Sequence, residues 1–190
     1  MQDVRDLDDD GNLQRDALGH VGVSLLHAAF FEHHQPDQLV ESLLDELGTG
    51  RIGIDMLQFK GIEFRSVDNR LMALKLVQLG LSGAAMFGPD GAVLQPSETL
   101  RKKAILVERG SFRPPTVVNI DMLECAREKF ESEVGDTPIL TLTELTMRNL
   151  LDGGLDVDRR DFLARADLLA ACGMTVLISD YADYHRLAAY

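Results

Sequence analysis

Strand-like and helix-like segments alternate along this chain from residue 51 onward, and this alternation restricts the possible folds more than any other feature. "KAILVERG" at 103–110 is the clearest strand, apolar from Ala104 to Val107 as in a buried parallel strand. The segments between the strands carry apolar residues at helical spacing. Such an alternation predicts an α/β fold, with a three-layer, mainly parallel, Rossmann-like sheet and helices on both faces.

The expected elements follow from these patterns. We expect strands at 51–59, 83–87, 103–110, 137–145 and 174–180, and helices at 66–80, 119–130, 158–173 and 181–190. Ser66 and Asp158 are predicted to cap the helices that they precede. Residues 1–50 are predicted to form an N-terminal helical segment, which could be the tail of a missing N-terminal part, and residues 51–190 the Rossmann-like domain.

Charge and composition exclude several classes of partner. A net charge of −12 argues against nucleic acid and against an anionic membrane surface. No apolar run approaches the roughly 20 residues that span a bilayer. Cys125 and Cys172 are far apart in the sequence and are predicted to be buried, reduced thiols. These features predict a cytoplasmic protein with a small-molecule partner, and they do not predict an oligomeric state.

In parallel sheets, ligands bind outside the carboxyl ends of the strands, so the candidate site residues are those that follow each strand. These are Asp55, Gly88 to Asp90, Arg109 to Thr116, Glu144 to Thr146, and Ser179 to Tyr181.

The turn after residue 108 has the composition of an anion site. Gly110 allows close approach of a phosphate to the backbone, Ser111 adds a hydroxyl donor, and Arg109 and Arg113 add positive charge. Residues 101–113 hold five basic side chains and one acidic one, a local charge of +4. The alternative is an ordinary proline-rich connection between a strand and a helix.

The same turn resembles a known family. "GSFRPPTVVN" is similar to the first signature of the nicotinamide/nicotinate mononucleotide adenylyltransferases, in which this turn holds the triphosphate of ATP. Gly110, Ser111, Phe112, Pro114 and Thr116 match that signature, and Asn119 stands where the family has a histidine. The resemblance assigns the catalytic positions to Thr116 and Asn119. Neutral Asn is a weaker electrostatic substitute for that histidine.

The family's second signature, Ile-Ser-Ser-Thr-x-x-Arg, is only partly matched by "ISDYADYHR". Ser179 fits the pattern, but Asp180 replaces the second serine and Arg186 comes two residues late. The resemblance implies a nucleotide-binding protein that uses ATP and Mg²⁺ to transfer an adenylyl group to a mononucleotide. The alternative is a non-catalytic ligand-binding or scaffolding module. Glu144, Thr146 and Asp180 could bind Mg²⁺ or a ribose, or cap the following helices.

Two other patterns suggest metal binding only weakly. Asp6, Asp8 and Asp10 open like a calcium loop, but Ala17 occupies the position of the bidentate glutamate, which favours an acidic turn. His20, His27 and His34 recur every seven residues, about 10 Å apart along a helix, too far to share a metal. We therefore predict no metal site formed by protein side chains alone.

Overall fold

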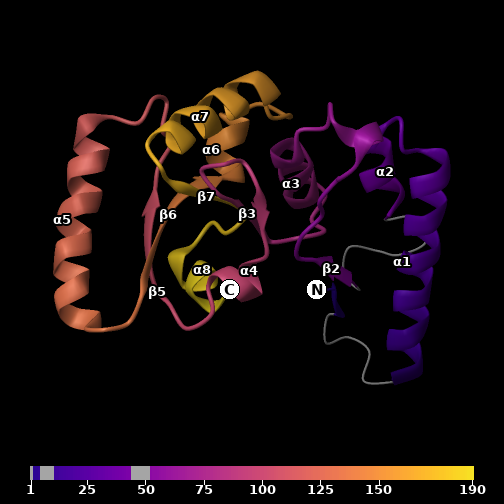
Figure 1. The fold of residues 1–190 in the computed structure, drawn as a ribbon, viewed down its shortest axis with the longest axis horizontal. Coiled ribbons are helices and arrows are strands. Elements are labelled where there is room, and N and C mark those ends of the chain that lie inside the picture. Colours follow the sequence, from indigo (N-terminus) through magenta and orange to yellow (C-terminus); the bar gives the residue numbers. More distant parts are fainter. Residues whose placement is uncertain (1, 5–10, 44–51) are drawn as a thin grey trace. The chain divides into compact units, whose positions relative to one another are not determined.

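The computed structural model describes residues 2–4, 11–43 and 52–190 of the chain (Figure 1). Its elements in chain order are β1 (Gln2–Val4), α1 (Gly11–Phe31), α2 (Pro36–Ser42), β2 (Ile52–Ile54), η1 (Ile62–Phe64), α3 (Asn69–Gln78), β3 (Ala84–Phe87), β4 (Val93–Leu94), α4 (Pro96–Thr99), β5 (Ala104–Arg109), α5 (Val117–Val134), β6 (Ile139–Thr146), α6 (Met147–Leu151), α7 (Arg159–Ala171), β7 (Thr175–Ser179) and α8 (Tyr184–Ala189).

The chain forms two compact units, Met1–Gly83 (unit 1) and Ala84–Tyr190 (unit 2). The boundary expected between residues 50 and 51 falls in a segment, 44–51, outside the described residues. The three aspartates at 6, 8 and 10 also lie outside them. No helix of the described chain is long and apolar enough to cross a membrane.

Unit 1 is built from helices around an apolar core. Ala17, Val21 and Ala28 of α1 are buried there with Val40 of α2 and Leu76 of α3. The strand expected at 51–59 is short, and β2 pairs antiparallel with β1 in a separate two-stranded sheet. That strand therefore does not belong to the five-stranded sheet of unit 2.

Unit 2 contains the α/β sheet, with strand order β4-β3-β7-β6-β5. β5, β6 and β7 pair in parallel, whereas β3 is antiparallel to both β4 and β7. The sheet is therefore mixed, and the expectation of a mainly parallel sheet was wrong for half of its strand pairs. The physical reason is the turn at 88–91, where Gly91 has a φ of +75°. This turn folds the chain back into a second strand, and β3 therefore runs against the strands that follow it.

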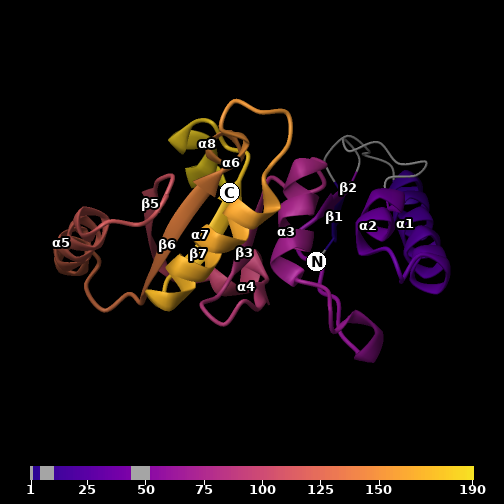
Figure 2. The ribbon, with the colours of Figure 1, turned by 90° about the horizontal axis from the view of Figure 1, so that it is seen from above.

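Helices lie on both faces of this sheet. One face carries Met86, Leu142 and Leu177 and packs with Leu187 of α8. Because side chains alternate along a strand, Phe87 points to the other face. There its ring meets Phe162 of α7 edge-on, with the ring centroids 6.2 Å apart. Figures 1 and 2 show α5 beside β5, at the edge of the sheet.

The structure tests the predicted helix caps and the predicted burial of the two cysteines. Asp158 caps α7 as predicted, since its side chain accepts hydrogen bonds from the backbone N–H groups of residues 160 and 161. The cap of α3 is Asp68 rather than Ser66, and it accepts from the backbone N–H of Arg70. Cys125 and Cys172 are free but exposed, so their predicted burial was wrong.

Candidate functional site

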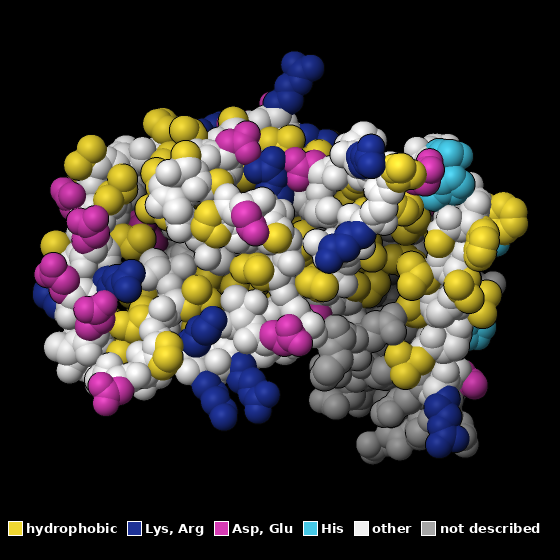
Figure 3. Space-filling view, in the orientation of Figure 1, with side chains coloured by type: hydrophobic (Ala, Val, Ile, Leu, Met, Phe, Trp, Pro, Cys, Tyr) yellow, Lys and Arg dark blue, Asp and Glu magenta, His cyan; other side chains and the backbone are white. Residues whose placement is uncertain are grey.

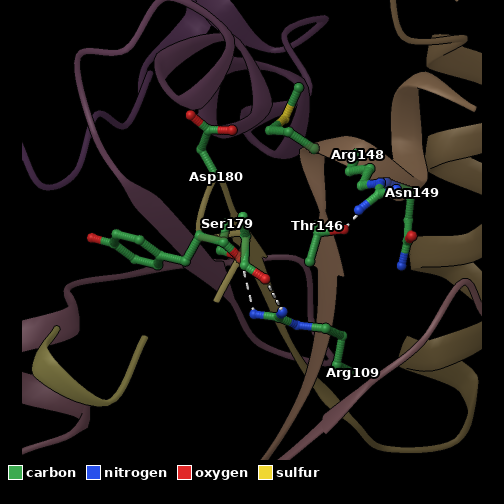
Figure 4. Close-up of a pocket in the computed structure, with 9 residues that line it drawn as sticks. Arg109, Thr146, Arg148, Asn149, Ser179 and Asp180 are labelled. Atoms are coloured by element: carbon green, nitrogen blue, oxygen red, sulfur yellow. Dashed lines mark hydrogen bonds between the residues drawn. The ribbon is translucent and has the colours of Figure 1, made fainter. Parts of the chain in front are cut away.

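A pocket of about 240 Å³ lies at the carboxyl ends of the three parallel strands of unit 2 (Figure 4). Arg109, Thr146 and Ser179, the last residues of β5, β6 and β7, line it. Arg148 and the segment 180–182 complete much of its wall. This is the edge at which ligands bind in parallel sheets, and the structure brings Arg109, Ser179 and Asp180 together there.

Strand register places a buried ion pair beneath the pocket. Arg109 lies opposite Glu144 in the parallel pairing of β5 and β6. Their guanidinium and carboxylate form two hydrogen bonds, from Nε to Oε2 at 2.7 Å and from Nη2 to Oε1 at 3.0 Å. The Ser179 hydroxyl donates a further hydrogen bond to Glu144. Glu144 is fully buried, and this bidentate pairing satisfies a charge that would otherwise be costly to bury.

The remaining donors of Arg109 hold the segment after β7. Nη1 donates to the carbonyl of Ala182 at 2.8 Å, and Nη2 donates to that of Tyr181 at 3.0 Å. The guanidinium carbon also lies 4.3 Å from the ring centroid of Tyr184. The hydrogen bond with Glu144 raises the pKa of the Arg109 guanidinium. Arg109 is thus a structural support for the pocket, with its donors already bound inside the chain.

Gly110 and Phe112 form a compact turn rather than an open cradle. A Cβ added to Gly110 would lie 3.0 Å from the Phe112 ring, so the close neighbour that requires glycine here is an aromatic side chain. Phe112 is buried and has a φ of +43°, a conformation that side chains larger than glycine rarely adopt.

Buried Arg165 of α7 fixes the turn from below. Its Nη1 donates to the carbonyl of Ser111 at 3.1 Å and to that of Asn149 at 3.4 Å. Asn149 in turn donates from Nδ2 to the carbonyl of Gly110 at 3.3 Å. The sequence analysis missed Arg165, although it stands on the apolar stripe of its helix, beside Phe162 and three residues after it. A charged residue on the apolar side of a helix indicates a buried and paired side chain, so this position could have been identified from the sequence.

Arg113 points to two acids. Its guanidinium pairs with Asp152 and with Asp161, the latter at 2.9 Å. These hydrogen bonds raise the pKa of Arg113. Asp161 also pairs with Arg165, so the turn and α7 are joined by a chain of alternating charges.

Thr116 and Asn119 cap α5. The Thr116 hydroxyl accepts from the backbone N–H of Asn119, and the Asn119 side chain accepts from the backbone N–H of Thr116 at 2.9 Å. The Asn119 amide donates to Glu108 at 2.8 Å. Both predicted catalytic side chains therefore have a structural role at the start of this helix.

The other predicted positions are separated from the pocket or support it. Gly88 to Asp90 follow β3, and because β3 is antiparallel to β7 they lie at the opposite end of the sheet from Ser179. Asp55 belongs to unit 1. Thr146 caps α6 by accepting from the backbone N–H of Asn149 at 3.2 Å. Within the described part of the chain, no three His, Cys, Asp or Glu side chains are grouped as a metal site.

The sequence analysis missed Arg148, the charged residue among the unpredicted residues that line the pocket. It is exposed, lines the pocket and has no ion-pair partner among the residues that the structure describes. The available signal was its position, three residues after the end of a predicted strand.

Comparison of the chain with protein-family models gave no match. Comparisons with curated proteins and with solved structures gave none either. The resemblance of residues 110–119 to an adenylyltransferase signature therefore stays a prediction from those residues.

Proposed function

We propose that this chain binds a small phosphate-bearing ligand, such as a mononucleotide, in the pocket at the carboxyl ends of β5, β6 and β7. The observation that carries the proposal is the contrast between two arginines. Arg109 is held by Glu144 and two carbonyls, whereas Arg148 lines the same pocket with its guanidinium uncommitted within the described residues. An exposed guanidinium beside a rigid polar floor is suited to bidentate pairing with phosphate.

Further groups in the pocket fit this ligand class. The hydroxyl of Thr146 accepts one hydrogen bond and can still donate its proton to a phosphate oxygen. The carboxylate of Asp180 lines the pocket, and Mg²⁺ is commonly held by one or two carboxylates together with substrate phosphates. ATP and Mg²⁺ thus remain the proposed ligands, with Asp180 as the protein's contribution to the metal.

The size of the pocket limits how much of a nucleotide it can enclose. A volume of about 240 Å³ is below the ~300–1,000 Å³ of pockets for drug-sized ligands. It fits a phosphate group with an attached sugar better than a complete ATP molecule. We therefore expect the base of a bound nucleotide to lie outside the pocket.

The geometry favours binding without adenylyl transfer over the transfer itself. Thr116 and Asn119 already form a capping box, and Arg113 already pairs with two acids. The parallel pairing of β5, β6 and β7 supports a Rossmann-like origin for this part of unit 2. We propose that this part is retained as a binding module, and that the signature-like turn supports it structurally.

Calorimetric titration of the full chain with Mg·ATP, AMP, ribose 5-phosphate and inorganic phosphate tests the proposal. We expect a dissociation constant in the micromolar range for at least one phosphorylated ligand, about −8 kcal/mol. Arg148→Ala should weaken binding by about tenfold or more, because a charge-assisted hydrogen bond contributes about 1.5–3 kcal/mol. Arg127→Ala removes another exposed arginine, paired with Glu131 on α5, and is the matched control.

Two results would contradict the assignment. If Arg113→Ala abolished binding and Arg148→Ala did not, the phosphate would bind at the turn and not in the pocket. No heat with any of these ligands at millimolar concentration would exclude the phosphate-binding function. Formation of a dinucleotide from ATP and nicotinate mononucleotide, reduced ten- to a thousandfold by Asn119→Ala, would instead support adenylyl transfer.

A further inference from the structure

Helix α1 presents a second apolar face that the described residues of its own unit do not cover. Its inner face buries Ala17, Val21 and Ala28. Next to this inner face, Leu18 and Leu25 are each 41% exposed, and farther round the helix Leu26 is 62% exposed. Figure 3 shows hydrophobic side chains along the surface of α1. Contiguous exposed apolar patches of this kind mark interaction sites.

The outer face has the spacing of a helix–helix seam. Leu18, Gly22, Leu25 and Ala29 follow one another at intervals of four, three and four residues, and all four are exposed. This is the spacing at which side chains of one helix pack between those of another. We call these four residues the α1 seam.

Large and small residues alternate along the α1 seam, and this alternation indicates the partner. When two copies of α1 lie antiparallel, with the two-fold axis between residues 22 and 25, each leucine meets a small residue of the other copy. Leu25 lies over the partner helix's glycine, and Leu18 lies over its alanine. A parallel pairing would place leucine against leucine and glycine against glycine, leaving gaps at the small residues. The seam is therefore complementary to itself in one orientation, as a two-fold interface requires.

Charge leads to the same conclusion. No Asp, Glu, Lys or Arg occurs between Asp16 and Glu32, in a chain with a net charge of −12. Two such acidic chains repel each other over most of their surface, and they can approach most closely where neither carries charge. The absence of Lys and Arg from this stretch also disfavours an acidic partner or an anionic membrane.

No neighbouring side chain among the described residues of unit 1 requires glycine at position 22. A Cβ added to Gly22 would meet no atom within 4 Å, and the same holds for the neighbouring Gly19. Glycine inside a helix is less stable than alanine, so this position costs helix stability that nothing nearby offsets. A second helix packed closely against Gly22 would account for it.

We infer that two copies of this chain associate through their α1 helices, antiparallel, with Leu18 and Leu25 of each copy packed on Ala29 and Gly22 of the other. The α1 seam contains only two leucines, each 41% exposed, beside one glycine and one alanine. Two such seams bury less than the ~1,200 Å² of standard stable interfaces. The association should therefore be weak, with a dissociation constant in the micromolar range.

Sedimentation velocity of the full chain between 1 and 200 µM tests the association. We expect a concentration-dependent shift from monomer to dimer. Gly22→Ala should weaken association at least tenfold, because its Cβ meets Leu25 of the other copy, while the thermal midpoint of the dilute monomer rises. Leu168→Gln, which removes an exposed leucine of α7 in unit 2, is the matched control and should leave association unchanged.

Orientation is tested by oxidative cross-linking in a background in which Cys125 and Cys172 are replaced by serine. A mixture of Leu18→Cys and Ala29→Cys chains should form the mixed disulfide, whereas Leu18→Cys alone should not cross-link. A monomer at 200 µM, or equal association of the wild type and Gly22→Ala, would overturn the inference. Binding of the monomer to neutral lipid vesicles through α1 would overturn it in favour of a membrane surface.

Discussion

At the scale of single residues, unit 2 depends on charges that are buried in pairs. Glu144 is fully buried, and Arg109 is the cation that neutralises it. Burying an ion pair contributes little net stability compared with a well-packed apolar pair. Removing one member, however, leaves an uncompensated charge in the interior.

We therefore expect Arg109→Met, which leaves the fully buried Glu144 without its cation, to lower the free energy of unfolding of unit 2 by about 3–5 kcal/mol. The double variant Glu144→Leu/Arg109→Met should recover a large part of this loss, since no lone charge remains buried. Urea denaturation followed by tyrosine fluorescence measures the effect on unit 2 alone. All three tyrosines lie in that unit, and the chain has no tryptophan. A single variant as stable as the wild type would show that the pair is not buried in solution.

A second residue-scale prediction concerns the pH dependence of the pair between Asp161 and Arg165. Burial alone would raise the pKa of the Asp161 carboxyl, but hydrogen bonds from Arg165 and Arg113 outweigh it and hold that pKa below 3.8. A lowered pKa in the folded state stabilises the protein above the unfolded pKa. That contribution is lost as the pH falls through the folded value.

Asp161→Asn should consequently lower the free energy of unfolding by about 1.5 kcal/mol at pH 7. The difference in the free energy of unfolding between this variant and the wild type should stay constant down to about pH 5. It should decrease toward zero below the unfolded pKa of the carboxyl. Thermal unfolding between pH 7 and pH 3 measures it. Asp136→Asn, in the exposed loop before β6, makes the same chemical change and is the control. A difference that grows as the pH falls would contradict the assigned sign.

At the scale of elements, the capping box of α5 allows a test of what the signature-like turn does. Thr116→Ala removes the hydroxyl that accepts from the backbone N–H of Asn119 and should cost about 1 kcal/mol of stability. Thr116→Ser keeps a capping hydroxyl and should restore most of that loss. Neither variant should change the affinity for a phosphorylated ligand by more than about twofold. Loss of ligand affinity in Thr116→Ala without loss of stability would show that this hydroxyl contacts the ligand.

The strands and helices of unit 2 were predictable where the sequence has a clear apolar run or cap residue. Whether neighbouring strands pair in parallel or antiparallel was not predictable. The apolar run from Ala104 to Val107 was correctly predicted to be a strand, but β5 is an edge strand whose residues are half-buried, so its predicted burial was wrong. Asp158 before an apolar-periodic segment is a strong cap signal. The turn at 88–91, in contrast, fits a hairpin as well as a loop that leads to a helix, since Gly permits positive φ in either. Sequence alone does not decide between them, because the choice depends on which neighbouring strand the chain meets.

For the candidate site, the position in the sheet was predictable from the sequence, and the pairing of its side chains was not. Its position at the carboxyl ends of the parallel strands follows from the order of elements. Whether an arginine at the site has an ion-pair partner does not follow from the order of elements. It depends on residues 35 or more positions away in the sequence, such as Glu144 for Arg109. Sequence proximity therefore made the turn look like the anion site, and tertiary pairing shows Arg109 and Arg113 to be engaged already.

At the scale of the whole molecule, each unit contains an apolar cluster of its own. The core of unit 1 gathers buried residues of α1, α2 and α3. That of unit 2 gathers Ala84, Met86, Leu142 and Leu177 from three strands of its sheet. The two proposed activities therefore belong to different units. Self-association is proposed for α1 of unit 1, and ligand binding is proposed for the pocket of unit 2.

This separation predicts that residues 84–190 fold as a chain on their own. The fragment keeps all five strands of the sheet, and its length is well above the ~60 residues at which small domains become marginal. We expect it to unfold cooperatively on heating, with tyrosine fluorescence and near-ultraviolet circular dichroism like those of the full chain. Brief proteolysis of the full chain should also yield a stable product that begins near Gly83.

The same fragment separates the two proposals from each other. Because it lacks α1, it should stay monomeric at 200 µM, where we expect the full chain to dimerise. Because it keeps the pocket of Arg148 and Ser179, it should bind a phosphorylated ligand with the affinity of the full chain. A folded fragment that still dimerises would place the interface in unit 2, and one that no longer binds ligand would show that unit 1 contributes to the site.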